Sequence, residues 1–122
     1  MKKALLVDDS TTLLMSMEGV LRKAGWEVKT ATGGQEALRT LQGFKPDLII
    51  TDLNMPGMDG ITLIREIRRL PQTRFVPILM LTTESLQSKR QEAKAAGATG
   101  WLVKPVQASA LMDVVRRVVP GA

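Results

Sequence analysis

Short apolar runs bounded by polar or turn residues recur along the chain and predict five buried strands. They cover residues 4–7, 26–31, 48–50, 76–81 and 100–103. Between and after them, apolar residues three and four positions apart predict five helices over residues 11–24, 35–42, 60–70, 86–96 and 109–119. The hydroxyls of Ser10, Thr11 and Ser109, together with Asp59, are expected to cap helices.

Strands that alternate with helices at crossover spacing predict an α/β fold with a parallel sheet covered by helices on both faces. Two strand orders fit this alternation, the dinucleotide-binding order and the flavodoxin-like order 2-1-3-4-5. Because no GxGxxG sequence follows the first strand, we expect the flavodoxin-like five-stranded parallel sheet flanked by five helices. The 122 residues suit one domain, 1–122, and leave no room for an output domain.

Composition shortens the range of possible chemistry. The chain has neither cysteine nor histidine, which excludes thiol nucleophiles, histidine-based triads and the usual zinc sites. It also has no apolar run long enough to span a bilayer and no secretory signal, so we expect a cytoplasmic protein. The net charge is +5, but many cations fall near predicted helix ends, so an acidic protein partner is favoured over nucleic acid.

The polar residues that follow the predicted strands are the candidate functional residues. In a parallel sheet of this order, ligands bind beyond the carboxyl ends of the strands, and those ends carry Asp8, Asp9, Asp52, Thr82, Thr83 and Lys104. Crowded carboxylates favour a hard cation, most simply Mg²⁺, and the neighbouring lysine and hydroxyl suit phosphate oxygens. One carboxylate would then act as a nucleophile and form an aspartyl phosphate.

Taken singly, each residue also has a structural explanation. Asp52 can simply end a strand, Asp9 can cap a helix, Thr82 can satisfy a loop amide and Lys104 can extend from the last strand to solvent. The combination from separate strand ends favours a functional site over four unrelated structural roles.

These residues, with the sequence Asn54-Met55-Pro56-Gly57 after Asp52 and the pair Lys104-Pro105, resemble the receiver domain of two-component response regulators. The resemblance spans essentially the whole chain and is greatest to single-domain chemotaxis regulators. It implies that Asp52 accepts a phosphoryl group from a histidine kinase and that Mg²⁺ is bound by Asp9, Asp52 and the Asn54 carbonyl, with Asp8 acting through water. It also implies that Lys104 and Thr82 contact the phosphoryl group, beside Thr83, and that the Lys104–Pro105 bond is cis.

The resemblance further implies how the signal leaves the site. Thr82 and an aromatic residue on the last strand, here Trp101 where Tyr or Phe is more usual, would move and alter a partner-binding face. A static Trp101 with a solvated N–H edge is the alternative. Asn54 and Glu84 lie where the family varies in phosphoryl lifetime. The expected face of this monomer comprises Leu86, Ala93, Lys94, Trp101, Ala110, Asp113 and Val114.

Three functions remain open from the sequence. The first is a switch that binds a downstream protein such as the flagellar motor switch, with a phosphatase as a further partner. The second is a phosphate sink or phosphorelay carrier. The third is a Mg²⁺-dependent phosphohydrolase, which is disfavoured because no substrate-binding lid is visible. In the first two cases the protein is not an enzyme beyond its own phosphorylation and slow dephosphorylation.

Overall fold

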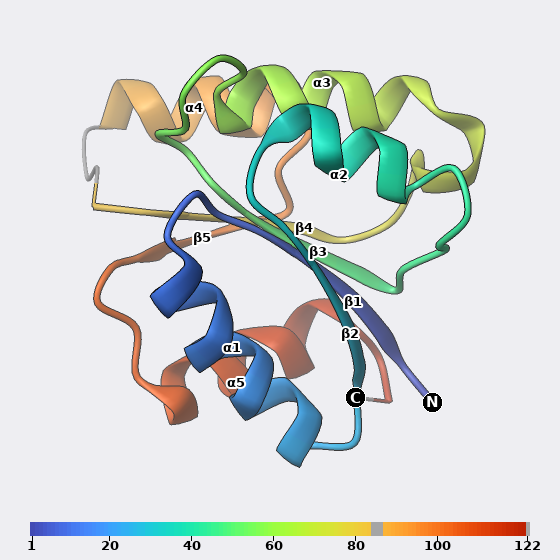
Figure 1. Ribbon diagram of the computed structural model, residues 1–122. Helices are drawn as coiled ribbons and strands as arrows, with labels where there is room; N and C mark the ends of the chain where they lie inside the picture. The colour runs from blue at the N-terminus through green and yellow to red at the C-terminus, as the bar shows by residue number, and fades with distance from the viewer. Residues whose placement is uncertain (84–86, 122) are drawn as a thin grey trace.

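A five-stranded parallel sheet forms the centre of the molecule in a computed structural model that describes residues 1–83 and 87–121. The strands run in the order β2-β1-β3-β4-β5 (Figure 1). Their bounds are β1 Lys3–Val7, β2 Glu27–Ala31, β3 Leu48–Asp52, β4 Ile78–Thr82 and β5 Gly100–Val103. The predicted flavodoxin-like order is therefore confirmed.

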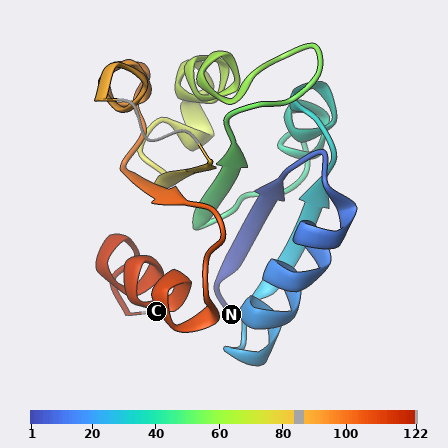
Figure 2. The same ribbon diagram turned by 90° about the vertical axis from the view of Figure 1, so that its left-hand side faces the viewer.

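Helices cover both faces of the sheet, as expected for right-handed crossovers between parallel strands. Figures 1 and 2 show α1 and α5 on one face and α2, α3 and α4 on the other. Their bounds are α1 Thr11–Lys23, α2 Gly34–Thr40, α3 Gly60–Arg69, α4 Gln87–Ala96 and α5 Ala108–Val118, with a short 3₁₀ helix at Pro71–Thr73. No helix in the described ranges is both long and apolar enough to cross a membrane.

The two faces of the sheet support two separate apolar layers. Alternation along β1 places Leu6 in the layer under α1 and α5, and Leu5 in the layer under α2, α3 and α4. The inner strands β3 and β4 are buried at every position, which explains their continuous apolar sequence. This sandwiched sheet gives the carboxyl ends of its strands a rigid base.

Several predicted boundaries need correction. Strand β4 begins at Ile78 rather than Val76, because Pro77 lacks an N–H and contributes only its carbonyl, which accepts from Ile49. Helix α5 begins at Ala108, and Ser109 lies inside its first turn rather than capping it, because the backbone of Gln107 already accepts from Leu111. The caps by Ser10 and Asp59 are confirmed, whereas the predicted helix start at 86 lies outside the described residues.

Candidate functional site

Strand register brings the acidic residues together at one edge of the sheet. Val7 lies opposite Thr51, so Asp8 and Asp52 follow side by side at the ends of β1 and β3. Asp8, Asp9 and Asp52 each offer a carboxylate oxygen, and these oxygens lie within 4.8 Å of one another. Asp8 and Asp52 are buried, while Asp9 is exposed. The predicted convergence of acids is therefore present in the fold.

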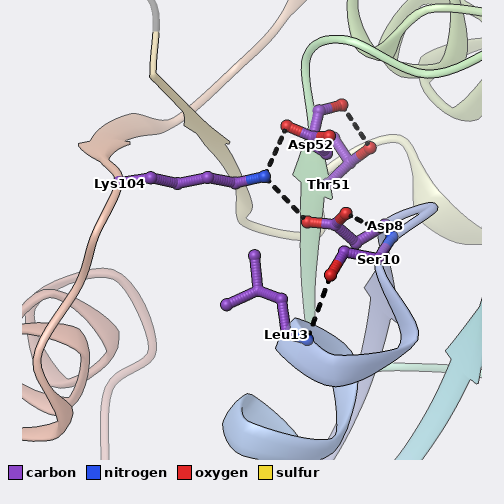
Figure 3. A network of polar contacts seen from close by, with 6 residues as sticks. All are labelled: Asp8, Ser10, Leu13, Thr51, Asp52 and Lys104. Atoms are coloured by element: carbon purple, nitrogen blue, oxygen red, sulfur yellow. Dashed lines mark hydrogen bonds and ion pairs between the residues drawn. The ribbon is translucent and has the colours of Figure 1, made fainter.

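Lys104 reaches this cluster from the segment after β5. Its Nζ lies 3.1 Å from an oxygen of Asp8 and 3.1 Å from an oxygen of Asp52 (Figure 3). The lysine side chain is 20% exposed, so the ammonium lies at the mouth of the cluster and not in the apolar core. The Lys104 ammonium offsets the repulsion that the neighbouring carboxylates of Asp8, Asp9 and Asp52 would otherwise produce.

Asp8 also connects the site to the start of α1. Its Oδ1 accepts a hydrogen bond from the Ser10 backbone N–H at 2.9 Å, and the Ser10 hydroxyl accepts from the Leu13 N–H at 3.3 Å (Figure 3). Its Oδ2 is buried and has the Lys104 ion pair but no hydrogen bond of acceptable geometry within the described chain. A buried carboxylate oxygen with unused accepting capacity is a suitable ligand for a cation.

The ionisation of the site reflects its burial. Burial and then the Asp8 carboxylate raise the pKa of Asp52 above its usual range, and Lys104 opposes this rise without cancelling it. Burial alone would lower the pKa of Lys104, but its contacts with Asp8 and Asp52 outweigh burial and raise that pKa. The ammonium therefore remains charged, while the Asp52 carboxylate is held in an environment that disfavours its charge.

Two further residues that the sequence did not single out as site residues shape the backbone at Asp52. The Thr51 hydroxyl donates to the Asp52 carbonyl at 3.0 Å. Gly60 packs directly against the same carbonyl, where any side chain would collide with backbone, and its N–H donates to Leu53 at 2.8 Å. Because Gly60 follows the predicted cap at Asp59, the sequence predicts it only as the start of a helix. Nothing in the sequence indicates its contact with the Asp52 carbonyl.

The remaining predicted phosphoryl-site residues are Thr82, Thr83, Asn54 and Glu84. Thr82 is buried at the end of β4, and its backbone carbonyl accepts from the Lys104 N–H at 2.8 Å. Thr83 and Asn54 are exposed, and the Lys104–Pro105 bond is cis. Glu84 lies outside the described residues. The roles of these residues stay predictions.

The expected partner face is only partly accessible. Ala93 is 1% exposed and packs in the core, so its inclusion in the face was wrong, because helix α4 buries this side against the sheet. Val114 is also partly buried against the core under α5. Lys94, Ala110 and Asp113 are exposed, and Leu86 lies outside the described residues.

Trp101 belongs to β5, and its side chain is partly buried on the side of the sheet that α4 covers. Its ring packs against the core layer under α2, α3 and α4, and the Arg90 guanidinium lies 5.7 Å from its ring centroid. The indole Nε1 is buried without a hydrogen-bond partner in the described part of the chain. The solvated N–H edge expected for a static anchor is therefore absent. Beside the ring lies a cavity of about 250 Å³, lined by Arg90, Ala93, Lys94, Ala98, Thr99, Gly100 and Trp101.

A family model for the response regulator receiver domain matches residues 4–116, which include all of β2 to β5, all of β1 except Lys3, and every residue of the acidic cluster. The chain belongs to the response regulator receiver family. Receiver domains are signalling modules that receive phosphate from histidine kinases and are not enzymes in the usual sense, and the resemblance inferred from the sequence is confirmed.

Similar proteins agree with this assignment. The chain is 36% identical over 117 residues to the chemotaxis protein CheY of Pseudomonas aeruginosa, covering 95% of this chain and 94% of that protein. The structure of Vibrio cholerae CheY4 superposes with a TM-score of 0.94 at 47% identity, covering 97% of this chain and 98% of that one. The chain also spans about half, 48%, of the length of mycobacterial transcriptional regulators that it matches.

One similar structure holds a metal. The receiver domain of the sensor histidine kinase PA1611 from P. aeruginosa, with a TM-score of 0.88 and 32% identity, has a magnesium ion in its active-site cleft. It covers 97% of each chain. In our chain, the carboxylates of Asp8, Asp9 and Asp52 are an oxygen donor set that fits the same ion.

Proposed function

We propose that this protein is a phosphorylation-dependent switch in which Asp52 accepts one phosphoryl group. The observation that carries the proposal is the convergence of Asp8, Asp9 and Asp52 with the Lys104 ammonium at one edge of the sheet. An oxygen of Asp52 forms a bond to phosphorus while the P–N bond of a kinase phosphohistidine breaks and the electron pair leaves on the imidazole nitrogen. Water later breaks the acyl phosphate.

The other residues of the site stabilise the transferred group. Asp8, Asp9, Asp52 and the Asn54 carbonyl would hold Mg²⁺, which supplies charge neutralisation for phosphate oxygens. The contacts of Lys104 with Asp8 and Asp52 raise its pKa and keep its ammonium charged. The charged ammonium would then exchange its contact with Asp52 for a contact with the phosphoryl group. The buried Thr82 hydroxyl would donate to another phosphoryl oxygen.

The downstream step would use the face formed by α4, β5 and α5. A shift of Thr82 toward the phosphoryl group changes the surroundings of Trp101, whose indole N–H lacks a partner among the described residues and whose ring borders a cavity. The exposed residues Lys94, Ala110 and Asp113 would then contact a protein partner, for which a flagellar motor switch is the expected type, with a phosphatase as a second partner. The protein would act in the cytoplasm.

Intact mass spectrometry tests the phosphoacceptor. The wild type, incubated with a small-molecule phosphodonor, should gain the mass of one phosphoryl group with Mg²⁺ and little without it. Asp52→Asn should gain none, whereas Asp113→Asn, which neutralises an exposed acid on α5, should behave as the wild type. An adduct on Asp52→Asn, or none on the wild type, would overturn the proposal.

Fluorescence tests the coupling to Trp101. Trp26 is 4% exposed and would contribute its own signal, so the experiment uses a Trp26→Phe background. A change in emission on phosphorylation that disappears in Asp52→Asn would support movement at Trp101. Unchanged emission would favour the static alternative and a different output route.

A partner assay separates a switch from a phosphate sink or relay carrier. Phosphorylation-dependent binding of a motor-switch peptide to the face defined by Lys94 and Asp113 would support the switch. Rapid return of the phosphoryl group to a phosphohistidine protein, without such binding, would support the sink or carrier.

A further inference from the structure

Strand β2 is an edge strand of the sheet, so one of its two sides has no neighbouring strand in the described part of the chain. A groove of about 610 Å³ follows this edge between α1 on one face of the sheet and α2 on the other. Its lining consists of Glu18, Arg22, Val28, Lys29, Thr30, Arg39, Thr40, Gly43 and Phe44. None of these residues belongs to the site described above.

Strand pairing shows which backbone groups of β2 face the groove. The Glu27 N–H donates to Lys2, and the Ala31 carbonyl accepts from Asp8, so these residues direct their backbone groups toward β1. Alternation in a parallel ladder then directs the N–H and C=O groups of Val28 and Thr30 outward. The edge therefore presents the backbone N–H and C=O groups of Val28 and Thr30 to the groove, where a further strand could pair with them.

The Arg22 side chain, which comes from α1, covers part of this edge. Its Nη2 donates to the Val28 carbonyl at 3.0 Å, and its Nε forms an ion pair with Glu18 at 2.8 Å. Charged side chains on an edge strand commonly prevent unwanted strand pairing. The Arg22 side chain is half exposed, so it can leave the carbonyl without disturbing the core.

Cations lie on both sides of the edge. Arg22 lies on the α1 side, whereas Lys29 and Arg39 lie on the α2 side. Lys29 Nζ is 5.7 Å from the centroid of the Phe44 ring, which closes the α2 side of the groove and also has Lys3 Nζ at 5.9 Å. Glu18 is the one acidic residue in the lining, and it is already paired with Arg22.

We propose that this groove binds an extended acidic segment of a partner protein, which adds to β2 as a sixth strand of the sheet. Main-chain hydrogen bonds to Val28 and Thr30 would supply affinity, as in other cases of strand addition. Successive side chains of a strand point to opposite faces, so two consecutive acidic residues would meet Arg22 on one side and Lys29 with Arg39 on the other.

The charge distribution selects this occupant over a second copy of the chain. Two copies paired through β2 would bring Arg22, Lys29 and Arg39 of each against the same cations of the other, on chains that each carry a net charge of +5. An acidic segment gains from the same cations. The proposal needs no phosphorylation and does not depend on the function proposed for Asp52.

Titration with a labelled peptide of about six residues, containing an Asp-Glu pair between β-branched residues, tests the proposal. Binding is followed by fluorescence anisotropy at low salt and by the NMR shifts and hydrogen exchange of the Val28 and Thr30 amides. We expect saturable binding with slowed exchange at those two amides, and the same affinity for Asp52→Asn. A peptide with Asn-Gln in place of Asp-Glu should bind at least about tenfold more weakly.

Matched variants separate strand addition from general charge attraction. The double variant Lys29→Gln/Arg39→Gln should weaken binding about tenfold, whereas Arg65→Gln/Arg117→Gln, which removes the same charge from α3 and α5, should change it less than about twofold. A peptide N-methylated at alternate residues on its pairing edge should lose the exchange protection. Equal losses in both double variants, or no effect of N-methylation, would overturn the proposal, and so would dimerisation through β2 without peptide.

Discussion

Two partly buried cations, Lys104 and Arg68, contrast in what they bind. Lys104 contacts two carboxylates at 3.1 Å and its pKa is raised. Arg68 contacts no carboxylate in the described chain, and burial lowers its pKa. Instead its guanidinium donates to four backbone carbonyls, those of Thr73, Arg74, Val76 and Gly97, at 2.6 to 3.1 Å.

This difference separates an exchangeable cation from a fixed one. The oxygens around Lys104 belong to side chains that also suit Mg²⁺, so another cation can compensate them. The oxygens around Arg68 belong to the backbone of three segments: the end of the 3₁₀ helix, the loop that leads to β4, and the residue that follows α4. Because Arg68 holds these segments in place, its role is structural, whereas the role of Lys104 is open to ligands.

Arg68→Ala should cause the largest loss of stability. Removing the guanidinium leaves four carbonyls without their charged donor, and we expect a loss of about 3 kcal/mol in the free energy of unfolding. Arg69→Ala is the matched control, because the neighbouring Arg69 is exposed and forms an i,i+3 ion pair with Glu66 on the helix surface. Its effect should be within about 0.5 kcal/mol. Urea unfolding measures both, and equal effects would contradict the structural role.

Lys104→Met should cost less and, unlike Arg68→Ala, should be rescued by another cation. The variant leaves the buried Asp8 and Asp52 without their ammonium, but the Lys104 side chain is 20% exposed, so water can reach the carboxylates and limit the expected loss to about 1–2 kcal/mol at neutral pH. Saturating Mg²⁺ should recover most of this loss and none of the loss in Arg68→Ala. Thermal unfolding with and without the ion provides the measurement.

The pH dependence of Lys104→Met has a defined sign. Without Lys104, the pKa of Asp52 rises further, so the folded state takes up more protons than the unfolded state. Stability of the variant should therefore fall as pH rises from about the unfolded value of 3.8 to the raised folded pKa. The deficit relative to wild type should shrink on acidification through this window. A deficit that stays constant across it would show that the carboxylates are not its cause.

The sequence predicts the Lys104 side of this comparison and misses the Arg68 side. Strand ends are visible as transitions from apolar to polar residues, and the topology brings Asp8, Asp52 and Lys104 to one edge. Arg68 appears in the sequence only as one of two arginines near a helix end, and dipole complementarity explains both equally well. Only three-dimensional packing distinguishes the buried arginine from its exposed neighbour.

Backbone contacts are the second kind of feature that the sequence does not specify. Gly60 has a strong local explanation as the first residue of a capped helix, and its packing against the Asp52 carbonyl adds a constraint from another strand. The same holds at α5, where a serine of good capping type lies one residue inside the helix. Local patterns predict element types reliably, but long-range contacts select which local option is used.

Asp52→Asn should have the smallest effect on stability and the opposite sign. Burial and the Asp8 carboxylate disfavour the charge of Asp52 in the metal-free protein, so a neutral amide of the same shape should stabilise it by about 1 kcal/mol. Asp113→Asn, at an exposed acid, should leave stability unchanged.

The stability gain of Asp52→Asn should be present above the raised pKa of Asp52 and vanish below about 3.8, where the aspartate is neutral in both the folded and the unfolded state. Added Mg²⁺ should stabilise the wild type more than the variant, because the variant loses a ligand. A variant less stable than wild type without metal would instead show that the Lys104–Asp52 pair outweighs burial, and Asp52 would then resemble a structural ion-pair partner more than a group held ready for chemistry.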